Sequence, residues 1–140
     1  MPCLEISMPR VPYEVKARLA DELTAAFATE TGWDASIFGI RFLEYEPGQA
    51  ALGGRISAEG TEKPYLHLLL YIPRISRTNK RKLVAAWSRI LAEGLGHPEW
   101  LPIVHINEHP YDNVGVEGQL LSEKFEELGR REFYYPLPKD

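Results

Sequence analysis

The sequence predicts an α+β fold in which one βαβ unit occurs twice and forms a four-stranded mixed sheet with two helices on one face. Three observations predict this fold. The chain matches itself without gaps at an offset of 64 residues, so that Pro9 and Arg10 correspond to Pro73 and Arg74. Each copy starts with an alternating apolar strand and continues with a helix whose apolar residues recur at helical spacing. Each copy ends in a second strand and a glycine-bearing turn.

The same offset continues through the whole unit. It pairs Leu19 with Leu83, Leu23 with Trp87, Phe27 with Leu91, Gly32 with Gly96, Ile40 with Val104, Phe42 with Ile106, Glu44 with Glu108 and Gly54 with Gly118. We therefore predict one domain over residues 1–140, made of a first unit at 2–60 and a second unit at 64–120. Residues 121–140 have no counterpart in the first unit. They predict a short helix N-capped by Ser122 and an aromatic arm, of a kind that often packs on a neighbouring subunit.

The opening strand of each unit alternates between apolar and more polar residues, which is typical of a half-buried strand. The apolar positions are Leu4, Ile6 and Met8 in the first unit and Leu66, Leu68, Leu70 and Ile72 in the second.

A helix follows each opening strand. Pro12 is expected in the first turn of the first helix, and Ser76 is expected to cap the second. The apolar faces consist of Val15, Leu19, Leu23 and Phe27, and of Leu83, Trp87, Ile90 and Leu91. The stretches TETG and GLGH place a glycine after the last turn of each helix.

The second strands are FGIRFLEY and LPIVHINE, followed by the turns ALGGR and GVEGQ. Strand, helix and strand in one unit predict a right-handed crossover with parallel strands. With both helices on one face, the other face is bare. It carries Glu5, Arg41, His67, Leu69, Tyr71, His105 and Asn107. Because leucine and tyrosine on a sheet face favour burial, we expect the subunits to associate through it.

Composition restricts the functional class. The chain has 140 residues, 44% hydrophobic and 26% charged, with a net charge of −4, so we expect no nucleic-acid or membrane partner. The apolar run LHLLLYI is too short to cross a bilayer, and no charged-then-apolar leader precedes it. Cys3 is the only cysteine, which excludes an internal disulfide and favours a cytoplasmic location.

A duplicated βαβ unit that opens with Met-Pro resembles the tautomerase superfamily, which includes 4-oxalocrotonate tautomerase, macrophage migration inhibitory factor and the 3-chloroacrylic acid dehalogenases. The arginine at the first strand–helix turn is a further feature of the resemblance. The stretches EPGQAALGGR and DNVGVEG are similar to the turns that follow the second strands in two-unit members. The resemblance covers roughly residues 2–120. It implies a homotrimer with active sites at subunit contacts, and chemistry that needs no cofactor.

The resemblance implies a catalytic role for Pro2. Once Met1 is removed, the proline of the family is a terminal secondary amine that acts as general base or acid. An α-amino group titrates at about 7.7–8.0, nearer neutrality than other amines, and burial lowers its pKa further. In the second unit Pro2 corresponds to Leu66, which has no free amine, so we predict one catalytic site per chain. The plain alternative is a chain end whose small second residue allows Met1 to be removed.

Arginines are the candidates for binding a substrate carboxylate, because the guanidinium is planar, charged and bidentate. By resemblance they are Arg10, Arg41, Arg74 and Arg77, and Asn113 resembles a pocket asparagine. Each arginine has a plain alternative: Arg41 shares a face with Glu5 and forms an ion pair, and the others are solvated turn or helix residues. The lysine that binds carboxylate in the migration inhibitory factor falls near Trp33, so that contact is missing.

These residues predict a tautomerase that moves a proton in a small 2-hydroxy-dienoate or enolpyruvate-type acid, with Pro2 as base. Two alternatives stay open. One is a cofactor-free dehalogenase, hydratase or decarboxylase of a 3-carbon acid, in which Glu44, Glu108, Asp112 or Glu117 would orient water. The other is a non-enzymatic trimer that binds a ligand in a vestigial site. No metal site is predicted, because His105 and His109 lie on a strand and its exit, where their side chains do not converge.

Overall fold

The computed structural model describes residues 2–58 and 62–124. The first unit comprises β1 (Cys3–Pro9), α1 (Tyr13–Thr31), the short 3-10 helix η1 (Ala35–Ile37), β2 (Gly39–Tyr45), β3 (Ala51–Leu52) and β4 (Arg55–Ile56). The second unit comprises β5 (His67–Ile72), α2 (Arg77–Gly94), β6 (Ile103–Glu108), the 3-10 helix η2 (Tyr111–Asn113), β7 (Gly115–Val116) and β8 (Gln119–Leu120), and α3 (Leu121–Lys124) follows.

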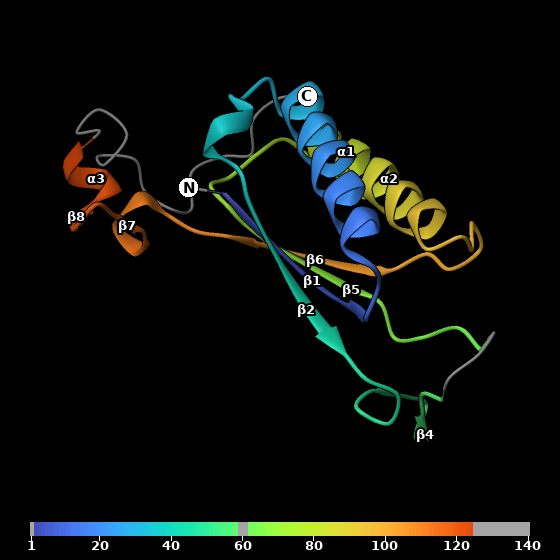
Figure 1. Cartoon of the computed structure of the whole chain (residues 1–140). Coiled ribbons are helices and arrows are strands. Elements are labelled where there is room, and N and C mark those ends of the chain that lie inside the picture. The colour runs from blue at the N-terminus through green and yellow to red at the C-terminus, as the bar shows by residue number, and fades with distance from the viewer. Residues whose placement is uncertain (1, 59–61, 125–140) are drawn as a thin grey trace.

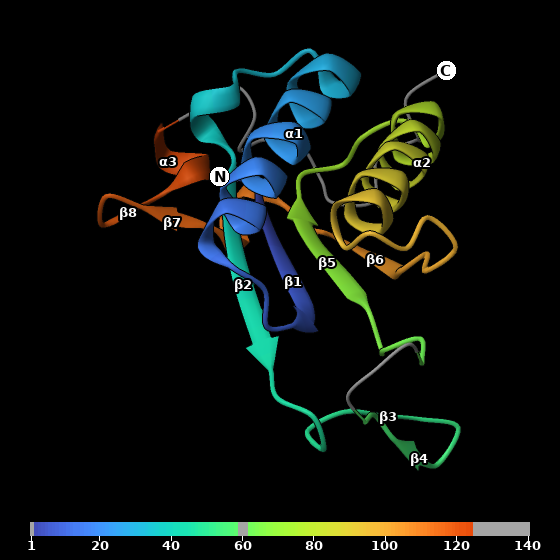
Figure 2. The ribbon, with the colours of Figure 1, turned by 45° about the vertical axis from the view of Figure 1, so that its right-hand side comes forward.

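Four strands form the main sheet in the order β2-β1-β5-β6. Each unit contributes a parallel pair, β1 with β2 and β5 with β6, and the two pairs meet through the antiparallel contact of β1 with β5. Both long helices cover the same face of this sheet, as Figures 1 and 2 show. The α+β fold with a mixed sheet and helices on one face is therefore confirmed.

The offset of 64 residues holds for the secondary structure as well as for the residues. The hairpin β3–β4 pairs Ala51 with Ile56, and the hairpin β7–β8 pairs Gly115 with Leu120, each position 64 residues later. At the contact between the helices, the indole Nε1 of Trp87 donates a 3.0 Å hydrogen bond to the carbonyl oxygen of Leu23. Leu23 and Trp87 correspond in the repeat, so equivalent positions of the two units meet across the helix pair.

The core lies between the sheet and the helices. The inward positions of the two central strands are fully buried, as the alternation predicts. Together with the helix faces, the core contains Leu4, Ile6, Met8, Leu68, Leu70, Ile72, Leu19, Leu23, Phe27, Leu83, Trp87 and Leu91, all at 0% exposure. No helix in residues 2–58 and 62–124 has the length and the apolar composition needed to span a bilayer.

The helix ends agree with the sequence at three of the predicted positions. Ser76 caps α2, since its Oγ accepts a 3.0 Å hydrogen bond from the N–H of Asn79. Gly32 follows α1 with φ of 72°, and Gly96 has φ of 78° after α2. Pro12 lies one residue before the first helical residue instead of within the first turn.

The prediction that Ser122 caps the last helix is wrong. The helix α3 starts at Leu121, directly after β8, so Ser122 lies inside it. Leu121 is buried at 8% exposure, and its packing brings the chain into helical conformation before the serine. The N–H of Leu120 instead donates a 3.0 Å hydrogen bond to the carboxylate of Glu123. The predicted aromatic arm lies outside the described residues.

Candidate active site

Pro2 is buried at the end of the sheet where β1 begins. Its carbonyl oxygen accepts a 3.1 Å hydrogen bond from the N–H of Gly39, the first residue of β2. Because β1 and β5 are antiparallel and Cys3 pairs with Tyr71, the start of β1 lies beside the end of β5. Pro2 is therefore next to Pro73, in the turn that leads from β5 into α2.

A pocket of about 670 Å³ opens at Pro2. Segments from both units line it: the connection from α1 through η1, the end of β5, η2, and the hairpin β7–β8 with α3. Figure 2 shows this hairpin and α3 at the end of the sheet where the chain begins. The lining residues used below are Trp33, Asp34, Pro73, Tyr111, Glu117 and Lys124.

The wall near Pro2 is aromatic. Trp33 packs edge-on against the buried ring of Phe27, with ring centroids 6.0 Å apart. Trp33 thus lines the pocket at the position where the resemblance places a carboxylate-binding lysine, so that part of the pocket is apolar. Tyr111 adds a second ring from η2.

The charged side chains among the lining residues are Asp34, Glu117 and Lys124. Hydrogen bonds from Ser36 lower the pKa of Asp34, and the ammonium of Lys124, 2.8 Å from Glu117, lowers the pKa of the Glu117 carboxyl. Two carboxylates therefore face one ammonium. An anionic substrate in this pocket needs further cations, because like charges repel it.

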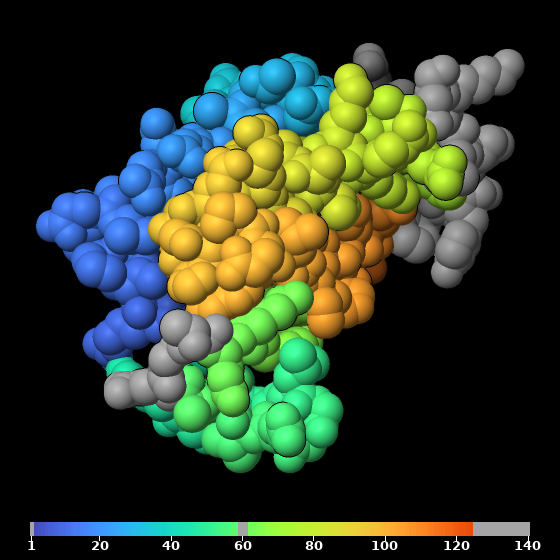
Figure 3. All heavy atoms as spheres, turned by 90° about the vertical axis from the view of Figure 1, so that its right-hand side faces the viewer, coloured from blue at the N-terminus to red at the C-terminus, as the bar shows by residue number. Residues whose placement is uncertain are grey.

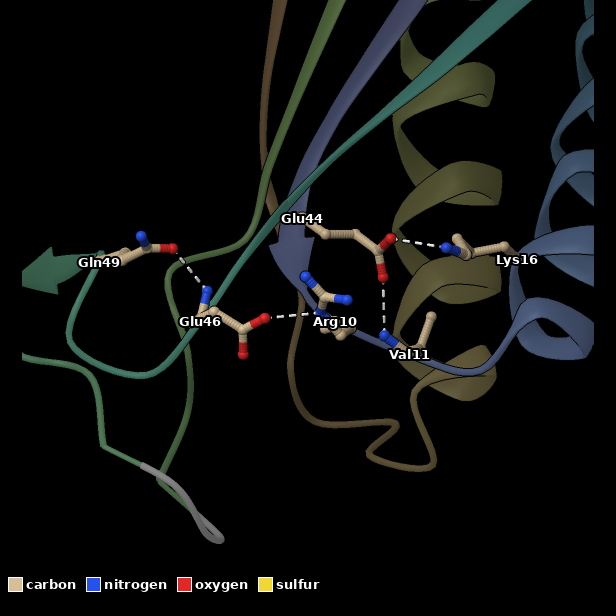
Figure 4. A network of polar contacts seen from close by, with 6 residues as sticks. All are labelled: Arg10, Val11, Lys16, Glu44, Glu46 and Gln49. Atoms are coloured by element: carbon tan, nitrogen blue, oxygen red, sulfur yellow. Dashed lines mark hydrogen bonds and ion pairs between the residues drawn. The ribbon is translucent and has the colours of Figure 1, made fainter.

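Two of the four candidate arginines lie at the Pro2 end of the sheet. Arg74 follows Pro73 and is half-buried, and Arg77 is the exposed first residue of α2. Arg10 lies at the other end of β1, where its Nε is 2.6 Å from Oε1 of Glu46, as Figure 4 shows. One chain thus brings Pro2 toward Arg74 and Arg77 and holds Arg10 apart from it.

None of the four candidate arginines lines this pocket, and neither does Asn113. Arg41 is on the bare face and pairs with Glu5, its register neighbour on β1, and this carboxylate raises the pKa of the Arg41 guanidinium. The ion pair is the plain alternative for Arg41 that the sequence offered. Asn113 is exposed at the end of η2, two residues after Tyr111.

Two acidic residues considered for orienting water are held in equivalent structural contacts. Glu44 accepts hydrogen bonds from the Nζ of Lys16, at 2.6 Å, and from the N–H of Val11, at 2.8 Å (Figure 4). In the second unit Glu108 accepts from Lys80 and from the N–H of Ile75. Each glutamate thus joins a second strand to the turn before a helix. Of the other two, Glu117 lines the pocket and Asp112 is exposed.

A smaller pocket of about 390 Å³ lies at the opposite end of the sheet. Its lining residues Pro9, Pro47 and Ser57 correspond, 64 residues later, to Pro73, Tyr111 and Leu121 of the larger pocket. Leu66, which corresponds to Pro2 in the repeat, is buried and does not line the smaller pocket. The two pockets are therefore equivalent by duplication, but no terminal amine belongs to the smaller one.

The described residues contain no group of three or more His, Cys, Asp or Glu side chains that could hold a metal ion. Near the Pro2 end, burial lowers the pKa of the His109 imidazole, and the backbone N–H of this residue donates a 3.1 Å hydrogen bond to the carbonyl oxygen of Ile72. Sequence reasoning missed Lys124 and Tyr111 as lining residues. They carry no motif, and their position depends on how η2 and α3 fold back.

Solved structures similar to this chain include native fused 4-OT, at 27% identity and a TM-score of 0.79, with 91% of this chain and 99% of that chain covered. The chain has the fold of the tautomerase superfamily. A second superfamily structure, the F6 fused 4-OT wild-type asymmetric trimer, matches at 26% identity and a TM-score of 0.76, covering 87% of this chain and 98% of that one. Pt0534 inactivated by 2-oxo-3-pentynoate matches at 21% identity and a TM-score of 0.76, over 88% and 98%.

The resemblance to the tautomerase superfamily, stated from short motifs, is thus confirmed by structures that span nearly all of both chains. No protein-family model and no curated protein matches the sequence.

Proposed function

We propose that this protein is a cofactor-independent tautomerase in which Pro2 is the general base and acid. Removal of Met1 would leave Pro2 with a terminal secondary amine. The observation that carries the proposal is the position of Pro2: it is buried, yet lines a pocket of about 670 Å³ formed by both units. Leu66, which corresponds to Pro2 in the second unit, has no free amine and does not line the smaller pocket.

The amine at this position suits proton transfer. Burial disfavours the charged form of an amine and lowers its pKa from about 7.7–8.0, while Asp34 and Glu117 act in the opposite direction. A base that titrates near neutral pH is the most effective at taking and returning a proton. The pyrrolidine ring also fixes the direction of the nitrogen lone pair.

The proposed substrate class is consistent with the cations at this end of the sheet. A small 2-hydroxy-dienoate or enolpyruvate-type acid carries a carboxylate and develops charge on its enol oxygen, which arginine or lysine stabilises. Lys124 lines the pocket, and Arg74 and Arg77 lie at the same end of the sheet. Lys124 was not among the residues expected from sequence.

Arg10 and Arg41 are proposed to reach a substrate from a neighbouring chain, and Asn113 is proposed to reach it from η2, which carries the pocket residue Tyr111. Within one chain Arg10 pairs with Glu46 at the far end of β1, and Arg41 pairs with Glu5 on the bare face. Subunit contacts that join the two ends of different chains would place such an arginine beside Pro2. Such an arginine would also offset the repulsion between an anionic substrate and the two pocket carboxylates.

We propose a homotrimer as the assembly. The F6 fused 4-OT structure is a trimer. The bare sheet face of this chain exposes Leu43 and Ile103, at 42% and 46%, beside half-buried Leu69 and Tyr71. Apolar side chains in this number on one face favour burial against another copy.

The test is ketonisation of 2-hydroxymuconate and of phenylenolpyruvate by the wild type, Pro2→Ala and the control Pro12→Ala, with intact mass recorded for each sample. Pro12 is exposed before α1, so this control removes a proline without altering the pocket. We expect Pro2→Ala to lower the rate by about a hundredfold or more and Pro12→Ala to leave it unchanged, because general base catalysis contributes roughly 10²–10⁴-fold.

Labelling provides an independent measurement. Pt0534 is inactivated by 2-oxo-3-pentynoate, so the same compound is offered to this protein and the modified peptide is located by mass spectrometry. Modification of the N-terminal residue supports a reactive amine even where the two test substrates are poor. Retention of Met1, or equal rates for the wild type and Pro2→Ala, would contradict the proposal. Release of chloride from 3-chloroacrylate would instead favour the dehalogenase alternative.

A further inference from the structure

An ion pair in the wall of the Pro2 pocket joins the β7–β8 hairpin to α3. The Nζ atom of Lys124 lies 2.8 Å from Oε2 of Glu117, and both residues line the pocket. Among the described lining residues, Lys124 is the only lysine or arginine, whereas Asp34 and Glu117 are both acidic. Figure 2 shows the hairpin and α3 together at the end of the sheet where the chain begins.

The backbone of Glu117 has a conformation that residues with a Cβ rarely adopt. Its φ is 55°, and it is the one residue other than glycine with a positive φ in the described part of the chain. It is the first of two loop residues between Val116 and Gln119, which pair across the hairpin. Glycine adopts such a φ readily, as Gly53 does at the equivalent position of the first unit. A strained residue at a pocket indicates that its side chain has a role there.

The repeat shows that this ion pair belongs only to the hairpin that lines the Pro2 pocket. Glu117 corresponds to Gly53, which has no side chain. In the described part of the first unit no helix follows β4, so α3 and its Lys124 have no counterpart there. Pro2 likewise corresponds to Leu66, which has no free amine. The terminal proline and the ion pair therefore occur together at one end of the sheet, which associates the pair with the chemistry of Pro2.

The ion pair is weak enough for Lys124 to change partners. The side chains of Lys124 and Glu117 are 43% and 77% exposed, and ion pairs between exposed side chains contribute little to stability. A substrate carboxylate offers Lys124 the same type of partner, and water can solvate the Glu117 carboxylate once it is released. Lys124 itself stays at the pocket, because Leu121 is buried and its N–H donates a 2.8 Å hydrogen bond to the carbonyl oxygen of Val114.

We propose that Lys124 binds a carboxylate of the substrate in the Pro2 pocket, and that Glu117 holds this lysine in position until the substrate replaces it. The inference rests on the proposed function, since it concerns the same pocket, and it adds a residue that determines specificity. Because Glu117 competes for Lys124, only a ligand with its own negative charge gains from the exchange. The pair thus makes the pocket select small carboxylic acids over neutral enols of the same size.

The first test is calorimetric titration with muconate, a dicarboxylate that lacks the 2-hydroxyl group and therefore cannot ketonise. The proteins are the wild type, Lys124→Gln and Glu117→Gln. Two controls make the same changes of charge elsewhere: Arg89→Gln, at an exposed position in the second half of α2, and Glu22→Gln, at an exposed position of α1.

We expect the two pocket variants to change the Kd for muconate in opposite directions. Lys124→Gln should weaken binding by about tenfold or more, because a charged hydrogen bond is lost. Glu117→Gln should tighten binding by about threefold, because the competing carboxylate is removed. Both controls should leave the Kd unchanged. A Kd unchanged in Lys124→Gln, equal weakening in both pocket variants, or no binding by the wild type at millimolar muconate would overturn the proposal.

Ketonisation of 2-hydroxymuconate separates binding from chemistry. Lys124→Gln should raise KM by about tenfold and leave kcat within about threefold, which is the pattern expected when binding alone is lost. Lys124→Arg should restore KM, which also serves where the glutamine variant folds poorly. A lower kcat with unchanged KM in Glu117→Gln would show that Glu117 takes part in the chemistry and would overturn its assignment as a holding residue.

The two proposals can fail separately. The rate of Pro2→Ala tests whether Pro2 is the base. The Kd for muconate requires no turnover, so it tests Lys124 even where the wild type and Pro2→Ala ketonise at equal rates.

Discussion

At the scale of single residues, the turns of the two hairpins show what duplication preserved and what it changed. Gly53 and Gly54 adopt φ of 58° and 78°, and the corresponding Glu117 and Gly118 adopt φ of 55° and 80°. Two successive residues with positive φ form the tight turn that matches the twist of a hairpin. Glu117 thus holds a conformation that costs a residue with a Cβ about 1–2 kcal/mol, and it does so at the Pro2 pocket.

The glycine after α2 gives a prediction at the same scale. Gly96 has φ of 78° and nothing within 4 Å of an added Cβ, so Gly96→Ala is penalised by backbone conformation alone. We expect the free energy of unfolding to fall by about 1 kcal/mol, measured by urea denaturation. Gly39→Ala is the control, because Gly39 has no positive φ and only an ordinary 4.0 Å contact. If Gly96→Ala and Gly39→Ala lower the free energy of unfolding equally, the left-handed conformation of Gly96 is not the cause of the loss.

At the scale of elements, each βαβ unit is joined at the turn between its first strand and its helix by a Glu–Lys pair and a backbone N–H. Glu44 with Lys16 and Val11 is repeated as Glu108 with Lys80 and Ile75. Side chains from the second strand and the helix thereby fix the position of the turn that precedes the helix. The turn of the second unit carries Pro73 and Arg74, so this contact also positions one wall of the pocket.

The pKa of Glu44 gives the pH dependence of this contact. The hydrogen bond from Lys16, followed by that from the Val11 N–H, lowers the pKa of Glu44 from 4.5 in the folded chain. A lowered carboxyl pKa contributes stability above pH 4.5, and this contribution is lost as the pH falls through the folded-state value. We therefore expect Glu44→Gln to cost about 1–2 kcal/mol at pH 7 and progressively less below pH 4.5.

Unfolding by denaturant across this pH range is the measurement, and the exposed Glu22→Gln is the control. The control should change little at any pH. A difference between Glu44→Gln and the wild type that stays constant down to the most acid pH would show that the charge of Glu44 is not what stabilises the turn.

At the scale of the whole molecule, the chain leaves apolar surface that one copy does not cover. Figures 1 and 3 show the β3–β4 hairpin standing away from the body of the molecule. It exposes Leu52 and Ile56, at 50% and 62%. A two-stranded hairpin is at best marginally stable alone in water, so contact with another chain would stabilise it. The bare sheet face adds Leu43 and Ile103 to this surface.

The bare face predicts how assembly responds to substitution. Leu43→Asp places a charge on the face that we propose to be buried between subunits, so we expect a trimeric wild type and a smaller species for the variant in native mass spectrometry. Tyr13→Asp is the control, because Tyr13 is 78% exposed at the start of α1, on the helix-covered side. A variant that remains trimeric at the wild-type concentration would contradict a role of this face in assembly.

The sequence by itself determined the fold of this protein. The period of two in the strands, the helical spacing and the capping residues are properties of near neighbours, and the repeat at 64 residues duplicates them. The alternate leucines of β5 are buried as expected, and Ser76 and Gly32 end up where local rules place them. The local rules failed at Ser122, where the helix already starts at Leu121, and were displaced by one residue at Pro12.

The tertiary structure decided the composition of the sites. The antiparallel pairing of β1 with β5 puts Pro2 beside Pro73, at the same end of the sheet as Arg74, and puts Arg10 at the opposite end. The fold-back after β6 brings Lys124 into the pocket and into contact with Glu117. The physical reason is that a site is made of side chains far apart in the chain. Which of them meet depends on strand order and register, which no local pattern encodes.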